Sequence, residues 1–202
     1  MRPPSLVTHR SIHRSKTFAS FASAAVLACA VLVLAGWTLG IQGLTSVVPG
    51  LPPMKPNTAI CLALLAAAIF VRMRIDSPPR WLILLPALAG SISALSVAET
   101  WFAIDFAIDQ LLFTEANTPD YRYPGRMAPI TGMSLTFLAF ALAIRDNVGL
   151  PLLCRQVCAI LPFAFGMLAV VGHAYGVHYI PNATSPFATM AVPTAPRLPA
   201  AP

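Results

Sequence analysis

Three acidic residues in the middle of the chain are the best candidates for chemistry. Glu99 lies near the end of a long apolar run, and Asp105 and Asp109 follow it, four residues apart. Residues four apart share a face if their segment is helical, and a carboxylate at the end of an apolar span is costly unless it is hydrated or paired. The three acids together could line an outward-facing site for a cation or an amine. The simpler interpretation is a hydrated loop helix over residues 106–113, and the sequence leaves both open.

Other chemically capable residues lack the spacing that their chemistry needs. Cys154 and Cys158 share a helix face, but two thiols with no nearby His or second Cys pair make a poor zinc site. His173 stands within an apolar run, where a packed polar residue is a simpler interpretation than a ligand. The sequence holds no nucleophile elbow, phosphate-binding loop or zinc-protease motif. We therefore expect neither an enzyme nor a bound metal or cofactor.

The composition indicates an integral membrane protein. Of the 202 residues, 57% are hydrophobic and 10% are charged, whereas soluble domains carry about a quarter charged residues. A net charge of +6 would suggest nucleic acid in a soluble protein. Here it is better explained by membrane topology and contact with anionic lipid headgroups, since no basic patch is interleaved with aromatic residues. We expect the lipid bilayer as a partner and no nucleic acid.

Five apolar runs have roughly the length that a membrane-spanning helix needs, about twenty residues. They predict an all-α membrane bundle over residues 18–177, preceded by a flexible basic cytoplasmic tail at 1–17 and followed by a Pro-rich irregular tail at 178–202. The five expected spans are residues 18–39, 56–71, 81–102, 129–144 and 152–175.

A short motif recurs three times along the chain. In each copy Met leads, Thr follows four places later, and a proline stands between them. Proline is favoured in the first turn of a helix, and Asn or Thr can satisfy the free N–H groups there, so each motif predicts a helix start. The motif residues are Met54, Pro56 and Thr58, then Met127, Pro129 and Thr131, and finally Met190, Pro193 and Thr194.

The motif has a second landmark upstream, a small residue before an aliphatic one, at Gly40, Ala103 and Gly176. From this landmark to Thr the first and third copies have the same spacing, and the second copy is ten residues longer. Such self-similarity indicates a repeated unit. We expect parallel out-and-back helical hairpins at 18–73 and 81–145 and a half repeat at 150–195. A sixth span is missing, because Pro196, Pro199 and Pro202 leave no helix-forming run after Thr194.

Glycines precede two of these landmarks by four residues. Gly36 with Gly40, and Gly172 with Gly176, either let helices approach closely or simply end them, and Glu99 stands at the corresponding place in the second repeat. Lys and Arg concentrate in the N-terminal tail and in the loops at 72–80 and 145–155. The positive-inside rule therefore places the N-terminus in the cytoplasm and loops 42–53 and 105–126 outside.

Two stretches carry a resemblance to a known group of proteins. Residues 54–59 read Met-Lys-Pro-Asn-Thr-Ala, and Asp-Phe-Ala-Ile-Asp-Gln-Leu-Leu-Phe at 105–113 leads to Gly-Arg-Met-Ala-Pro at 125–129. With the repeated hairpins, over about residues 34–195, they resemble the N-terminal multi-span sensor region of some bacterial histidine kinases and diguanylate cyclases. The resemblance implies sensing or anchoring ahead of cytoplasmic PAS, kinase or GGDEF domains, and it brings no catalytic residue.

The expected function is therefore a membrane sensor or anchor region without its output domain, truncated or stand-alone. Five spans that begin inside must end outside, so a signal would pass to a separate partner, such as a membrane histidine kinase, or through a homo-oligomer. The alternatives are a small multi-pass transporter or channel subunit and a passive membrane scaffold. A transporter should show charges or broken helices at mid-bilayer, and none is convincingly central.

Overall fold

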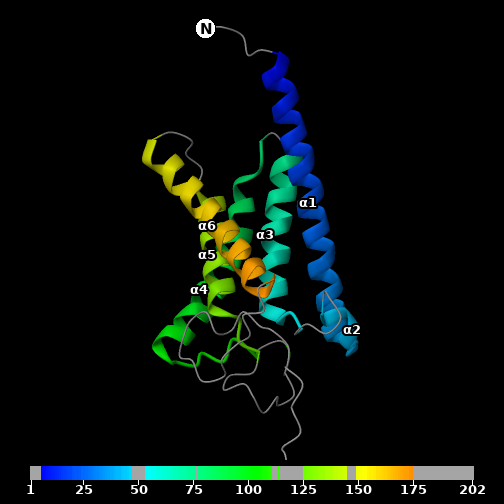
Figure 1. Ribbon diagram of the computed structural model, residues 1–202, viewed down its shortest axis with the longest axis vertical. Helices are drawn as coiled ribbons and strands as arrows, with labels where there is room; N and C mark the ends of the chain where they lie inside the picture. The colour runs from blue at the N-terminus through cyan, green and yellow to red at the C-terminus, as the bar shows by residue number, and fades with distance from the viewer. Residues whose placement is uncertain are drawn as a thin grey trace, which may run out of the picture.

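The computed structural model describes residues 6–46, 53–75, 77–110, 113, 125–144 and 149–174 (Figure 1). In this part of the chain every regular element is a helix. The elements are α1 (Leu6–Leu39), α2 (Gln42–Thr45), α3 (Pro56–Arg74), η1 (Arg80–Ile83, a 3₁₀ turn), α4 (Leu84–Phe102), α5 (Pro129–Ala143) and α6 (Gly149–Ala174).

Four stretches of the described chain are long and apolar enough to cross a membrane: Arg14–Leu39, Pro56–Arg74, Arg80–Phe102 and Gly149–Val171. This composition and length support a multi-pass membrane protein. The remaining long apolar helix, α5, has 15 residues. At 1.5 Å per residue it extends about 22 Å, less than the hydrocarbon core of about 30 Å, so the expected fifth span stays a prediction.

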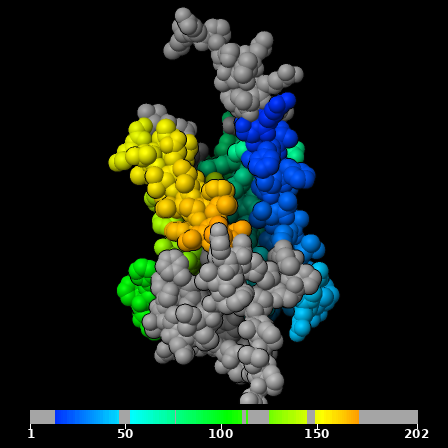
Figure 2. Space-filling view, in the orientation of Figure 1, coloured from blue at the N-terminus to red at the C-terminus, as the bar shows by residue number. Residues whose placement is uncertain are grey.

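The helices form two hairpins side by side (Figure 1). Helices α1 and α4 run in one direction, and α3 and α5 return in the other. The ends of α1 and α4 and the starts of α3 and α5 therefore meet at one end of the bundle, drawn at the bottom of Figure 1. We call it the loop end. Helix α6 crosses the front of the bundle and forms one side of the face seen in Figure 2.

The motif prolines begin the helices on the returning side, as the sequence predicted. Pro56 and Pro129 occupy the first turns of α3 and α5, each after a residue with non-helical backbone. The two landmark residues end the outgoing helices: Gly40, with φ 68°, follows α1, and Ala103, with φ 53°, follows α4. Left-handed backbone stops a helix, and glycine adopts it without the steric cost that Ala103 must bear.

A small-residue core joins α3, α4 and α5. Its centre consists of Cys61, Leu65, Ala89, Met127, Leu135 and Ala139. Gly90 lies so close to α5 that an added Cβ would stand 3.0 Å from the Cβ of Ala139. Close approach of this kind is how membrane helices gain packing contacts without a hydrophobic driving force between them.

Helix α6 belongs to this bundle through α5, where the rings of Phe137 and Phe165 lie 6.5 Å apart. Its large apolar side chains, from Leu150 to Val171, are mostly exposed, as expected for a surface that faces lipid. His173 lies in the last turn of α6, and its side chain is outside the described part. Met190, Pro193 and Thr194 also lie outside the described residues.

Three local expectations change. Residues 6–17, expected to be a flexible tail, continue α1 as helix, because no proline or glycine interrupts them. The helix expected over 106–113 is wrong for its described residues 106–110: residues 104–110 form bends and turns and no helix, with Ala107 left-handed at φ 57°. The glycines of the first hairpin do both of the jobs considered, since Gly40 ends α1 and Gly36 admits Leu44 of α2 at close range.

Candidate functional site

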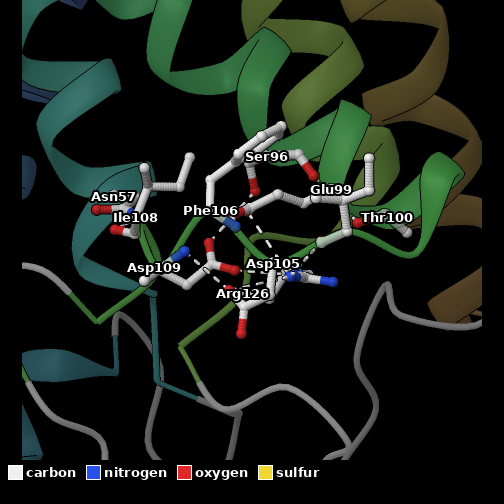
Figure 3. A network of polar contacts seen from close by, with 11 residues as sticks. Asn57, Ser96, Glu99, Thr100, Asp105, Phe106, Ile108, Asp109 and Arg126 are labelled. Carbon is white, nitrogen blue, oxygen red and sulfur yellow. Dashed lines mark hydrogen bonds and ion pairs between the residues drawn. The ribbon is translucent and has the colours of Figure 1, made fainter.

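A buried network of polar side chains lies at the loop end of the second hairpin (Figure 3). Its members come from α3, from α4, from the segment after α4 and from the segment that leads into α5. We call this group the loop-end network. It consists of Asn57, Ser96, Glu99, Asp109 and Arg126.

Glu99 is the most buried ionisable residue of the network, with 0% of its surface exposed. It stands one turn from the end of α4, and its Oε1 accepts a hydrogen bond of 2.7 Å from the backbone N–H of Phe106. Its Oε2 has no hydrogen-bond partner. The guanidinium of Arg126 approaches Oε2 to 3.8 Å, which is ion-pair distance but too long for a hydrogen bond.

Arg126 makes its strongest contact with Asp109. The Nε of Arg126 donates a 2.8 Å hydrogen bond to Oδ2 of Asp109, and the two side chains are only 8% and 6% exposed. Its Nη2 donates a longer bond of 3.4 Å to the carbonyl of Ile104. A charge-assisted bond this short, removed from solvent, holds the segment before α5 against the segment after α4.

The segment after α4 is also tied to the first hairpin. Asn57, in the first turn of α3, donates a 3.1 Å hydrogen bond from its amide to the carbonyl of Ile108. Ser96 of α4 lies 3.5 Å from Oδ1 of Asp109, at the limit of a hydrogen bond. The loop after α4 is thus fastened through its residues 104–109 to α3, to α4 and to the segment that leads into α5.

Gly125 makes the closest backbone approach of the site. Its φ is +81°, and a Cβ added there would stand 2.7 Å from the carbonyl oxygen of Asp109. Only glycine meets both conditions without strain. The chain can therefore bring Arg126 alongside Asp109 because the preceding residue has no side chain.

All three predicted site residues lie within ion-pair distance of Arg126, but only two of them are buried there. Glu99 and Asp109 are buried at 3.8 and 2.8 Å from the guanidinium, whereas the side chain of Asp105, at 3.9 Å, is 62% exposed. Asp105 instead accepts a 2.8 Å bond from the N–H of Ala107 and shapes the turn. The two aspartates do not share a helix face, because the segment between them is not a helix.

Sequence reasoning missed Arg126, Asn57 and Ser96 as members of the site. Arg126 carried one usable signal, since it directly precedes the second motif, at the start of a predicted helix. Asn57 was expected to satisfy free N–H groups of its own helix, but its amide reaches across to another hairpin. Nothing in the pattern around Ser96 separates it from the other serines of α4.

The network can bind charge, and nothing in it marks a metal site of the usual kind. Within the described residues no group of three or more His, Cys, Asp or Glu side chains is placed to hold a metal ion. The two buried carboxylates of Glu99 and Asp109 face one buried guanidinium. Each of these buried charges needs a partner, because a buried charge without one is costly.

Polar side chains continue from the network into the bundle. Ser93, three residues before Ser96 on the same face of α4, is fully buried and lies 2.9 Å from the hydroxyl of Thr136 on α5. One of these two hydroxyls donates to the other, and the one that accepts donates to a carbonyl of its own helix, that of Ala89 for Ser93 or that of Gly132 for Thr136. These hydroxyls are satisfied locally and join α4 to α5.

Comparison with known proteins gave no matching family model, no matching curated protein and no matching solved structure.

Proposed function

We propose that this chain is the membrane sensor or anchor region of a bacterial signal-transduction protein. It would lie in the inner membrane with its N-terminus in the cytoplasm and its loop end outside, and it would cross the bilayer five times as parallel hairpin repeats. The proposed role is to bind a stimulus and pass on a change of shape, with the output step on a kinase or cyclase module of a partner. A homo-oligomer is the other route for the signal.

Labelling tests the proposed topology. The exposed residues Ile104, at the loop end, and Ser77, at the opposite end, offer positions for single cysteines in a background without the four native ones. A membrane-impermeant maleimide should label Ile104→Cys in cells with a permeable outer membrane, and Ser77→Cys only after lysis. The reverse pattern would contradict the orientation.

One observation carries the sensing proposal: a single buried network fastens one loop to α3, to α4 and to the segment that leads into α5. Asn57 belongs to α3, Glu99 to α4, and Arg126 stands just before α5. A stimulus that rearranges Arg126 would therefore act on both hairpins at once. A passive anchor has no need of buried charges, because the cost of their desolvation cancels most of the stability that pairing them provides.

Distances at the opposite end of the bundle test this coupling. Spin labels are placed at Ser77, after the end of α3, and at Leu150, at the start of α6. Both residues are exposed. In nanodiscs, Arg126→Gln should shift the distance distribution between them by several ångström if the helices move as coupled bodies. Arg80→Gln, which removes an exposed arginine, is the matched control and should leave the distribution unchanged.

An unchanged distribution in Arg126→Gln, with the protein still folded, would leave only the anchoring role. A milder variant, Arg126→Lys, keeps the charge but not the planar fork, so an intermediate shift is expected from it.

The alternative function is a small transporter or channel subunit, and one observation favours it. Buried polar residues continue inward from Glu99 along α4 to Ser96 and Ser93. Their local hydrogen bonds are equally suited to holding α4 against α5. Proteoliposomes decide between the two: ion flux that depends on Glu99 supports transport, and its absence supports the sensor.

A further inference from the structure

The loop-end network carries one more negative than positive charge among its buried side chains. Glu99 and Asp109 are 0% and 6% exposed, and the side chain of Arg126 is 8% exposed. Among the described residues the other carboxylate near Arg126 is that of Asp105, which is largely in solvent and is screened there. Two buried carboxylates against one buried guanidinium leave a negative charge, and burying such a charge without a partner is strongly unfavourable.

The unmatched charge is located on one atom. Asp109 has a 2.8 Å hydrogen bond from Arg126 and the hydroxyl of Ser96 at 3.5 Å. Glu99 has the N–H of Phe106 on Oε1, while its Oε2 has no hydrogen-bond partner and only a 3.8 Å ion pair. A carboxylate oxygen that is buried without a hydrogen bond needs an explanation, and a bound ion is one that fits its position beside Arg126.

We propose that Glu99 Oε2 binds a small monovalent cation, which completes the loop-end network. The cation supplies the missing positive charge. It makes the close contact with Oε2 that the guanidinium of Arg126, at 3.8 Å, does not make. A divalent ion suits the site less, because it would reverse the charge imbalance and needs six to eight oxygen ligands. The binding of the cation does not depend on signalling. Only its role as the stimulus rests on the proposed function.

Thermal unfolding of the purified full chain in detergent tests the proposal. The melting temperature is measured in sodium, potassium and methylammonium chloride, and in N-methylglucamine chloride, whose cation is too large for a buried site, at equal ionic strength. A ligand that binds only the folded state stabilises it in proportion to the logarithm of its concentration above Kd. At least one small cation should therefore raise the melting temperature with a saturable onset, and N-methylglucamine should not.

Two variants identify the site. Glu99→Gln removes the charge and keeps the shape, so it should abolish the difference between small cations and N-methylglucamine. Asp105→Asn removes an exposed carboxylate and is the matched control, so it should keep that difference. If Glu99→Gln does not fold, the comparison of cations on the unaltered chain still decides the proposal.

Three results would overturn it: equal melting temperatures in all four salts, a cation effect that survives in Glu99→Gln, or a melting temperature that depends on pH and on no cation. Failure here is distinct from failure of the sensing role. A cation effect without a distance change between Ser77 and Leu150 retains the site and rejects sensing, and a distance change in Arg126→Gln without a cation effect does the opposite.

Discussion

The two hairpins close their loop ends by different physical means. In the first, Gly36 of α1 receives Leu44 at van der Waals range, and the indole N–H of Trp37 donates a 2.9 Å bond to the carbonyl of Met54. In the second, the position that corresponds to Gly36 is Glu99, and the loop is held by Glu99 and by the pair of Arg126 with Asp109. Packing closes one hairpin, and buried charge closes the other.

The difference teaches where an external stimulus can act. Packing of Gly36 against Leu44 is insensitive to ions, because it involves no charge. The loop-end network depends on the balance of its charges, so any added ion changes its free energy. The two closures are also linked, since Asn57 of the first hairpin binds the loop of the second. A change in the charged closure therefore reaches the packed one.

Removing the guanidinium of Arg126 is expected to destabilise the protein more than any other change to the two closures. Arg126→Gln leaves the carboxylates of Glu99 and Asp109 buried without a cation, which is expected to lower the free energy of unfolding by about 3–5 kcal/mol. Denaturant titration in mixed micelles measures this. Arg80→Gln, at an exposed arginine, should stay within about 0.5 kcal/mol, and a similar loss in both variants would remove the special role of the buried charge.

The second-largest loss of stability is expected at a glycine with left-handed backbone. Each hairpin has one, but their surroundings differ. Gly125→Ala adds both a strained φ and a contact of 2.7 Å with the carbonyl of Asp109, so a loss of about 2–4 kcal/mol is expected. At Gly40 a Cβ meets nothing within 4 Å. Gly40→Ala should cost only the strain, about 1–2 kcal/mol. Equal losses would show that the contact with Asp109 is unimportant.

The packed closure is tested at Gly36. A Cβ there would stand 2.7 Å from the Cβ of Leu44, so Gly36→Ala should push α2 away at a cost of about 1–3 kcal/mol. Gly43, in α2 itself, has open space around it and is the matched control. Gly43→Ala should be neutral or slightly stabilising, and unfolding in the same micelles compares the two. A neutral Gly36→Ala would mean that α2 moves without cost.

The smallest expected effect belongs to Trp37. Trp37→Phe keeps an aromatic ring that can stack on Phe113, whose centroid lies 6.0 Å away, but removes the N–H donor to Met54. The expected loss is about 0.5–1.5 kcal/mol, the usual net value of one hydrogen bond. Because no charge is involved, this loss should be the same in all salts, whereas that of Glu99→Gln should vary with the cation. A salt-dependent Trp37→Phe would erase the distinction between the closures.

Several features of this protein follow from the sequence alone. Long apolar runs predict membrane helices because a span needs about twenty apolar residues, and four such helices are present in the described chain. Pro56 and Pro129 begin helices because proline is favoured in the first turn of a helix, a preference that acts within a few residues. Glu99 also stands out from its position alone, because an acid at the end of an apolar span needs water or a partner.

Only the tertiary structure decided what Glu99 contacts. Its partners Phe106 and Arg126 lie 7 and 27 residues further along the chain, and Asn57 reaches Ile108 across 51 residues. Such contacts depend on how the hairpins pack, which local spacing does not encode. The loop helix expected at 106–113 is absent over the described residues 106–110 for the same reason: burial of Asp109 against Arg126 outweighs local helix preference. Local rules determined where helices begin and end, and long-range charge pairing determined which side chains meet.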